Sequence, residues 1–577
     1  MKIQNLVLPP LGGMYPKEMF WRGDGLYDGN SLCLNKGERA SFDTFYNAIQ
    51  PGIWVDECGV YNLALHISGS GKVKICFYQK VENNEVTFLG EELIELSDGG
   101  ESISVPNWGN GKHAGIIYFI ITALERVLIT YGYFWTNQEP RQIVKLGLVI
   151  THYNRQNQVI PAAKRIVKEL LDDLDYSGID LVIVDNSQNL SRKDFDDRVI
   201  IIKNKNMGGS GGFARGLLYL KDNGFTHCNF MDDDAGCLTE SIKRTYSFFS
   251  FYFGKLNVGI SGVLLRDDTP HIVHESCGKW HKIDVRPINS GKNLLNTESL
   301  LALGKPYSHK GYGAWCYFGF KIADIKKWPF PFFVRGDDIL FSLQNNLKII
   351  NVLGIAATVD SFGDKDSANT FYLTLRAHFV ISIFMNQANV WSWWNRFVSY
   401  NKSPLFSGCY SWSYGAYLAL VDVLSSKYYF GKDIEGNVFS EHIKKIVPLE
   451  ESVNPCEYIK LMKKNKYDRE GVKHYILRKL TFNGLLCPVN LLDDNIIWNK
   501  ADGACYRRLC CYRKIFFIKK SGEIIVAKHD KIEILKGYYR NIIALVLILK
   551  NINSTIQRVK KELEECTEEE FWRKALL

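Results

Sequence analysis

The sequence lacks the features that mark several common classes of protein. Its longest run of purely apolar residues with membrane-like character, Ile542 to Leu549, is far too short to span a bilayer. No charged-then-apolar signal sequence opens the chain. The 14 cysteines are scattered and form no dense framework, which favours reduced thiols. These absences argue against an integral membrane protein and against a disulfide-stabilised secreted domain.

Strong charge and metal-ligand spacing are also missing. The net charge of +9 is mild for 577 residues, so the chain does not resemble a dedicated nucleic-acid binder, although it suits an anionic small molecule or an anionic membrane surface. Two groups of potential zinc ligands lack the required spacing: Cys505, Cys510 and Cys511, and His271, His274 and His281. The length and the 46% hydrophobic content indicate a globular protein of two to four domains.

The first region, residues 1–140, has the pattern of an all-β domain. Short alternating or aromatic-rich runs such as Tyr61–Ile67 and Val73–Tyr78 are separated by turn signals such as Gly69-Ser70-Gly71. The pattern predicts a β-sandwich or jelly roll. Such folds often bind carbohydrate through exposed aromatic residues, and a purely structural role fits the sequence equally well.

The second region, residues 141–390, alternates strands and helices. Apolar strands are predicted at Leu146–Thr151, Leu181–Val184, Val199–Ile202 and Cys228–Met231, and Ile160–Leu171 has helical spacing. This βαβ series predicts a Rossmann-like α/β domain with a parallel sheet. Ligands of such sheets bind beyond the carboxyl ends of the strands.

Polar clusters follow three of these predicted strands. Thr151–Arg155 and Asp185-Asn186 end two of them, and Asp232-Asp233-Asp234 ends the fourth. Asp232 and Asp234 are spaced to converge on a hard cation, Mn²⁺ or Mg²⁺, which would keep positions open for the two phosphates of a nucleotide-sugar. An acidic solvated turn is the alternative for the triplet alone.

A glycine-rich segment, Asn206–Gly216, precedes the acidic triplet. Its glycines allow backbone to pass close to a ligand, and the helix that follows offers N-terminal amides to anionic groups. The spacing matches neither a Walker A loop nor the dinucleotide-binding fingerprint.

Asn206–Gly216 followed by Phe230–Asp234 closely resembles the galactofuranosyltransferases of the inverting family-two glycosyltransferases. The resemblance covers roughly residues 142–390. It implies an N-terminal β domain, a central GT-A nucleotide-sugar domain and a mostly helical C-terminal region, here residues 391–577.

The resemblance also implies roles for individual residues. Arg155 would contact the nucleotide, Asn186 the uridine, and Trp315 would shape the sugar and acceptor pocket. The implied metal and diphosphate pair is Asp232 and Asp234, and the catalytic base is Asp338. The remaining implied substrate-binding residues are Asn206, Gly208, Gly209 and Asp337.

The sequence departs from the family pattern at two places. The family usually has an acid two residues after the base, where this chain has Leu340. It also has a metal-binding His ahead of an Asp-Lys-Asp motif. Here Asp364-Lys365-Asp366 is present but the His is absent, and Asp360 is the nearest possible substitute ligand.

We therefore expect an inverting, metal-dependent transferase that moves galactofuranose from UDP to a glycan acceptor, in surface-polysaccharide or lipid-linked oligosaccharide biosynthesis. One alternative is another UDP- or dTDP-hexose as donor. A second alternative, from a different class, is a glycan-binding scaffold whose transferase site has decayed.

The C-terminal region bears on location and assembly. Trp391–Phe397 could rest on a membrane surface or pack in a helical core. Residues 498–550 have a basic, β-like pattern, and residues 537–577 that of an amphipathic helix suited to assembly, such as a homo-oligomer. With no predicted span, we expect a cytoplasmic protein held peripherally at the inner face of the cell membrane.

Overall fold

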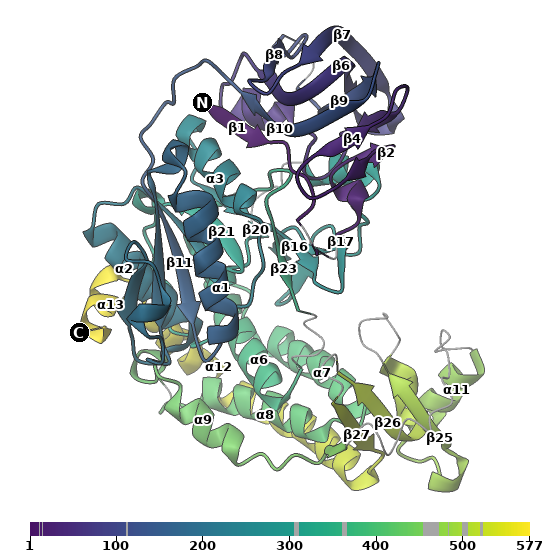
Figure 1. The fold of residues 1–577 in the computed structure, drawn as a ribbon. Coiled ribbons are helices and arrows are strands. Elements are labelled where there is room, and N and C mark those ends of the chain that lie inside the picture. The colour runs from purple at the N-terminus through teal and green to yellow at the C-terminus, as the bar shows by residue number, and fades with distance from the viewer. Residues whose placement is uncertain are drawn as a thin grey trace.

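The computed structural model arranges the chain in three regions from the N-terminus to the C-terminus (Figure 1). Antiparallel strands come first, a mixed sheet flanked by helices follows, and a mostly helical region closes the chain. The structure describes residues 1–576 except 11, 14, 111–112, 305–310, 361–365, 428, 454–471, 483, 499–505 and 520–522. Asp364 and Lys365 of the predicted Asp-Lys-Asp motif lie outside the described residues.

The N-terminal region is built around one long strand, β6 (Ala64–Lys80). Its two halves pair with different neighbours, β10 and β8 at one end and β9 and β7 at the other, all antiparallel. Gly69 and Gly71 separate the halves, and both have positive φ where the backbone of β10 and its preceding turn approaches closely. The other strands are β1 (Lys2–Asn5), β2 (Arg22–Gly23), β3 (Leu26–Tyr27), β4 (Leu32–Leu34), β5 (Arg39–Ser41), β7 (Val86–Leu96), β8 (Glu101–Ser104), β9 (Ile116–Ala123) and β10 (Val127–Trp135).

The central region contains a seven-stranded sheet of order β13-β12-β11-β14-β21-β15-β22. The first four strands are parallel, and β21 runs antiparallel to both of its neighbours. The strands are β11 (Leu146–His152), β12 (Ile179–Asp185), β13 (Ile200–Lys203), β14 (His227–Asp232), β15 (Val258–Ser261), β21 (Tyr317–Lys321) and β22 (Lys348–Ile350). The four strands predicted from the apolar runs are therefore confirmed, each to within one or two residues.

Smaller elements complete this region. The strands are β16 (Val263–Arg266), β17 (Thr269–Glu275), β18 (Gly278–Trp280), β19 (Val285–Pro287), β20 (Gly311–Tyr312) and β23 (Ala356–Val359). The helices are α1 (Gln156–Ile166), α2 (Gly208–Asp222), α3 (Thr239–Phe251), α4 (Thr297–Leu303) and α5 (Asp337–Gln344).

The glycine-rich segment is helical, where the sequence predicted a loop. Helix α2 begins at Gly208 itself and packs directly on β11. A Cβ at Gly212 would lie 2.3 Å from the Thr151 side chain, and one at Gly216 would lie 2.2 Å from that of Val149. The glycines therefore serve close helix–strand packing, which offsets their low helix propensity.

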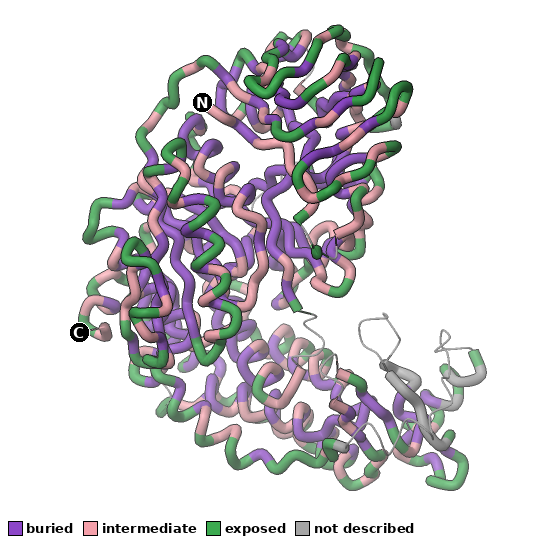
Figure 2. The backbone as a smooth tube through the Cα atoms, viewed as in Figure 1, coloured by how far each residue is buried: buried purple, intermediate pink, exposed green. Residues whose placement is uncertain are grey.

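The N-terminal strands are held on the central region by a buried ion pair. Arg244 of α3 is fully buried and bonds Glu240 at 2.7 Å. The Arg244 guanidinium also donates to the carbonyl oxygens of Tyr46 and Leu353. In Figure 2 buried segments lie in both of these regions. One apolar cluster accordingly includes residues from Ile3 to Val359.

The C-terminal region combines helices with a small sheet. The helices are α6 (Ala368–Phe384), α7 (Val390–Phe406), α8 (Tyr410–Leu424), α9 (Asn437–Lys444), α11 (Val472–Leu480), α12 (Lys531–Glu565) and α13 (Glu569–Ala575). The sheet contains β24 (Glu451–Val453), β25 (Asp493–Trp498), β26 (Tyr512–Ile518) and β27 (Ile524–Lys528). The predicted β-like stretch at 498–550 is thus wrong beyond residue 530. There the Asp530 side chain caps α12 by accepting from the amides of Ile532 and Glu533, and helical packing overrides the β-propensity of an Ile- and Val-rich run.

The aromatic cluster of α7 belongs largely to the core. Trp393 and Phe397 are fully buried, whereas Trp391 is 64% exposed. The packing alternative for Trp391–Phe397 is therefore the correct one for most of the cluster. Among the helices that the structure describes, none is both long and apolar enough to cross a membrane.

Candidate active site

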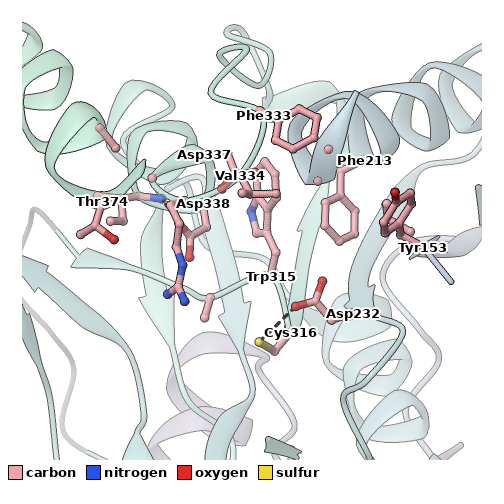
Figure 3. A pocket seen from close by; sticks show the side chains of 18 of the residues that line it. Tyr153, Phe213, Asp232, Trp315, Cys316, Phe333, Val334, Asp337, Asp338 and Thr374 are labelled. Atoms are coloured by element: carbon pink, nitrogen blue, oxygen red, sulfur yellow. Dashed lines mark hydrogen bonds between the residues drawn. The ribbon is translucent and has the colours of Figure 1, made fainter. Parts of the chain in front are cut away.

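A cavity of about 800 Å³ opens at the carboxyl ends of the parallel strands (Figure 3). It brings together most of the residues selected from the sequence. Those that line it are Arg155, Asn186, Asn206, Gly208, Gly209, Asp232, Asp234, Trp315, Asp337 and Asp338. Asp360 is not among its lining residues.

The middle acid of the triplet has a structural role. Asp233 is buried and accepts from the Tyr153 amide at 2.9 Å and from Arg155 Nη1 at 2.7 Å. The ring of His152 lies 3.3 Å from the same carboxylate. Burial would raise the pKa of Asp233, but its contacts with His152, Tyr153 and Arg155 outweigh burial and lower it. Asp233 therefore ties the end of β14 to the end of β11.

Asp232 and Asp234 flank this anchor and both line the cavity. Asp234 forms an ion pair with Arg155, with Oδ2 3.2 Å from Nη2. The Cys316 thiol lies 3.6 Å from Asp232 Oδ2. Across the described residues, no set of three or more His, Cys, Asp or Glu side chains is arranged to hold a metal ion. Two carboxylates still fit Mg²⁺ or Mn²⁺, because such ions are commonly bound by one or two carboxylates together with substrate phosphates and water.

The N-terminus of α2 forms another wall. Asn186 donates to the Gly208 carbonyl at 3.0 Å and accepts from Asn204 at 2.9 Å, so it fixes the start of the helix. Asn206 accepts from the Gly208 amide at 3.1 Å. Gly208 has φ +64°, and a Cβ there would lie 2.0 Å from the Phe333 carbonyl oxygen. The helix start and the loop before α5 are thus in direct contact, since the Ser210 amide donates to the Phe333 carbonyl at 3.1 Å. Gly208 and Gly209 line the cavity, so the positive end of the α2 dipole lies at its wall.

The second acidic pair begins α5. The preceding loop contains three residues with positive φ: Phe333 at 71°, Arg335 at 70° and Gly336 at 88°. Positive φ in Phe and Arg is strained, and such strain tends to gather at functional sites. Buried Arg376 of α6 supports the loop by donating to the Phe332 carbonyl.

Asp337 and Asp338 differ in their contacts. Asp337 is buried, and its Oδ2 accepts from Ser210 Oγ of α2 at 3.1 Å. Asp338 is half-buried and accepts from the Ile339 amide at 2.8 Å. Burial raises the pKa of Asp337 to about 6. Burial and the charge of Asp337 raise the pKa of Asp338 well above its ordinary value.

In the view of Figure 3, Trp315 lies between Asp338 and Asp232. It is buried and packs edge-on against Phe213, Phe230 and Phe341, with ring centroids 5.0 to 5.4 Å apart. Such packing fixes the orientation of the indole. Trp315 therefore forms a rigid part of the cavity wall, consistent with the shaping role that its sequence context implied.

Sequence reasoning missed two acids that line the cavity, Glu435 and Glu275, and the buried one is Glu275. It ends β17, is buried, and lies near enough to Asp338, Cys316 and Tyr312 to influence their pKa values. Burial raises the pKa of Glu275 to about 7. The neighbouring His274 also lines the cavity. The only signal in the sequence was an acid within a histidine-rich segment that lacked metal-ligand spacing.

Glu275→Gln is expected to stabilise the protein at alkaline pH. The folded-state pKa of Glu275, about 7, lies above the ordinary value of 4.5, so the folded protein favours the protonated carboxyl. The stability of the fold relative to the unfolded chain is therefore unaffected below pH 4.5 and declines as the pH rises from 4.5 through 7. Ionised Glu275 then costs about 3 kcal/mol, which Gln avoids. Thermal unfolding at pH 5 and pH 8 measures this. Glu101→Gln on exposed β8 is the control, and an equal effect of both substitutions at both pH values would contradict the expectation.

Asp360 follows β23 directly and is exposed. Two residues before it, Thr358 forms a β-bridge with Gly236, and Gly236 lies two residues after Asp234. The bridge brings the end of β23 beside the acidic stretch without placing Asp360 on the cavity wall. Its role as a metal ligand therefore stays a prediction.

Comparison with known proteins finds sequence similarity to a glycosyltransferase. The chain is 24% identical over 386 residues to the galactofuranosyltransferase GlfT2 of Mycolicibacterium smegmatis. The match covers 61% of this chain and 58% of the length of that relative. No protein-family profile matches the chain. The similarity supports assignment to the glycosyltransferases as a class, and at 24% identity it does not establish the donor sugar.

Similar solved structures include a mannosyltransferase and a mannosyl-3-phosphoglycerate synthase. A mannosyltransferase from Pyrobaculum calidifontis, in complex with GDP-Man and Mn²⁺, has a TM-score of 0.28 and 11% identity and covers 54% of this chain and 82% of its own. The mannosyl-3-phosphoglycerate synthase of Rubrobacter xylanophilus has a TM-score of 0.27 and 10% identity, over 43% of this chain and 76% of its own. TM-scores this low carry no weight, so the description of the fold rests on the strand order.

Proposed function

We propose that the protein is an inverting, metal-dependent glycosyltransferase of the GT-A type that transfers galactofuranose from UDP-galactofuranose to a cell-surface glycan acceptor. The acceptor would be a polysaccharide or a lipid-linked oligosaccharide. One observation carries the proposal. A single cavity at the strand ends contains two carboxylates suited to a metal–diphosphate and, from a different element, a second acidic pair suited to an acceptor hydroxyl.

The donor half of the cavity suits a nucleoside diphosphate. Arg155 and the positive end of the α2 dipole, at Gly208 and Gly209, supply positive character in the cavity that Asp232 and Asp234 line. A bound Mn²⁺ or Mg²⁺, held by these two carboxylates, would stabilise the charge that develops on the departing diphosphate. Arg155 would then exchange part of its ion pair with Asp234 for a contact with the nucleotide.

The acceptor half suits a direct displacement. Asp338 would take the proton from the acceptor hydroxyl as its oxygen bonds to the anomeric carbon, and the bond from that carbon to UDP breaks on the opposite side. The raised pKa of Asp338 makes its carboxylate a stronger base. Asp337, which accepts a hydrogen bond from Ser210, would fix the position of Asp338 relative to helix α2.

A donor screen tests the proposal. Purified protein is incubated with Mn²⁺, candidate glycan acceptors and either UDP-galactofuranose or other UDP- and dTDP-hexoses, and products are identified by mass. Transfer from UDP-galactofuranose alone is the expected result. Transfer from a different donor would retain the enzyme class and replace the sugar, while no UDP release with any pair would favour a glycan-binding scaffold.

We also propose that the protein is cytoplasmic and peripheral at the inner face of the cell membrane, because its net charge is +9 and its acceptor would be assembled there. High salt is expected to release it from isolated membranes, since salt screens attraction to anionic lipids. Fractionation followed by immunoblotting measures the release. Recovery only after adding detergent would contradict electrostatic attachment.

A further inference from the structure

Helix α12 carries a stripe of apolar side chains that no other part of the described chain covers. Six of them, at alternating spacings of three and four residues, are between 44% and 65% exposed: Ile532, Leu535, Tyr539, Ile542, Val546 and Leu549. Spacing of this kind places all six along one face of the helix. We call these six residues the α12 stripe.

The opposite face of α12 already has its partners. Ala544, Ile548 and Ile552 are buried in the cluster formed with α6, α7 and α8. Ile534 is buried in a second cluster with Leu405 of α7. The α12 stripe is therefore surplus to the packing of the fold, and it exposes more apolar surface than a solvated helix requires.

Exposed apolar residues continue around the α12 stripe. Helix α11 exposes Tyr475, Ile476 and Leu480, and Phe482 just beyond it is 64% exposed. The Phe482 carbonyl accepts a long hydrogen bond, 3.5 Å, from Tyr538 of α12. More than half of the large hydrophobic residues exposed in the described structure lie between residues 447 and 549. Figure 1 shows that α11 and β25 to β27 lie at the opposite end of the molecule from the N-terminal strands.

Charge identifies the kind of surface that would cover the stripe. Between Glu533 and Glu562 the helix has no acid and carries six basic residues: Lys536, Arg540, Lys550, Arg558, Lys560 and Lys561. Four of them pair with glutamates at or just beyond the ends of this stretch, and the helix as a whole still has more basic than acidic residues. Lys550 lies directly after the last residue of the stripe and is exposed. An apolar face bordered by Lys, with a tyrosine within it, is the pattern of a helix that lies in the interface of an anionic bilayer.

We propose that the α12 stripe is the surface by which this protein docks on a membrane containing anionic lipid. The stripe enters the boundary between headgroups and acyl chains, while the adjoining lysines contact lipid phosphates. This assigns docking to α12 and not to the aromatic cluster of α7, whose Trp393 and Phe397 are buried. The inference rests on the proposed peripheral location and on no step of the transfer reaction.

A second copy of the chain is the main competing occupant. The spacing of three and four residues would also suit pairing of two helices. Two copies of α12 would, however, bring together two helices that each carry seven basic and four acidic residues, and the excess of like charge opposes such pairing. Anionic lipid neutralises the same charges.

Vesicle flotation with the full chain tests the inference. Vesicles contain either phosphatidylcholine alone or equal parts of phosphatidylcholine and phosphatidylglycerol. Wild type is expected to bind the anionic vesicles far better. Leu535→Glu and Ile542→Glu are each expected to weaken that binding about tenfold, because each withdraws one apolar side chain from the interface. Leu93→Glu on β7, where Leu93 is 68% exposed, is the matched control and should bind as wild type.

Two results would overturn the inference. If wild type binds anionic vesicles and both α12 variants bind them as well as wild type does, the protein contacts the membrane through another surface and the α12 stripe is not the docking surface. If wild type binds no vesicle but is a dimer by light scattering, and Ile542→Glu is a monomer, the stripe is a subunit interface. UDP release measured with a soluble acceptor reports separately on the transferase activity, and an unchanged rate in the α12 variants shows that they are folded.

Discussion

Asp234→Ala is expected to reduce transfer by about a hundred- to a thousand-fold, the cost typical of removing one group that stabilises developing charge. Asp234 lines the cavity and shares Arg155 with the structural anchor Asp233. Its removal would take one of two carboxylate ligands from the proposed metal ion. The negative charge that develops on the departing diphosphate would then be poorly stabilised. Because Asp233 retains its contacts with Arg155 and Tyr153, the strand end should keep its shape.

The measurement is UDP release over a titration of Mn²⁺, with thermal unfolding as the check on folding. Asp197→Ala, which removes a fully exposed acid of the same region, is the control. Near-wild-type rates for Asp234→Ala in the presence of a chelator would show that Asp234 holds no metal.

The same titration with Mg²⁺ tests Asp360→Ala, since a carboxylate in place of the missing His favours harder cations. Unchanged metal dependence in that variant would remove Asp360 from the site.

The central sheet was predictable because local pattern and tertiary role agree there. Strand β11 is buried at all seven positions, so its sequence is a continuous apolar run, and the chain becomes polar at the strand end. The same pattern in the sequence is enough to place Arg155, Asn186 and Asp232 on one edge of the sheet. The spatial meeting of these residues with Asp338 of α5 depends on the loop from Phe333 to Gly336, whose positive φ values no local pattern announces.

Other features depend on packing between distant segments. Glu275 is buried among Tyr312, Cys316 and Asp338, which come from separate elements, so its sequence context gives no sign of its raised pKa. Trp391 and Trp393 stand two residues apart in one helix, yet the first is 64% exposed and the second is buried. The sequence allowed either a membrane surface or a helical core for both of them. The orientation of α7 on its neighbours decides which of them can reach a membrane.

Asp338 and Asp337 are distinguished by what surrounds them. Ser210 Oγ donates a hydrogen bond to Asp337 Oδ2, and a Cβ on Gly209 would lie 3.4 Å from the same oxygen. Asp337 therefore faces helix α2. Asp338 is half-buried at the cavity edge, where Glu275 and Asp337 raise its pKa while Arg335 opposes them. A raised pKa suits a group that must accept a proton near neutral pH. We therefore propose Asp338 as the base and Asp337 as its support, which is the assignment that the sequence resemblance implied.

Asp338→Asn is accordingly expected to lower kcat by about a hundred- to ten-thousand-fold, the usual range for loss of a general base, with donor affinity nearly unchanged. Because burial and Asp337 disfavour the ionised form of Asp338, the variant should unfold at a temperature equal to or above that of wild type, which separates lost chemistry from lost folding. Asp337→Asn is the matched control: its amide oxygen can still accept from Ser210, so it should retain more activity. Steady-state rates at saturating donor and acceptor give kcat, and calorimetry of UDP-sugar binding gives the donor affinity.

The wild-type rate should also fall as pH falls through the raised pKa of the base, and this dependence should be absent from the residual rate of Asp338→Asn. Equal rates for wild type and Asp338→Asn would assign the proton transfer to another group, such as Glu275, which lines the same cavity.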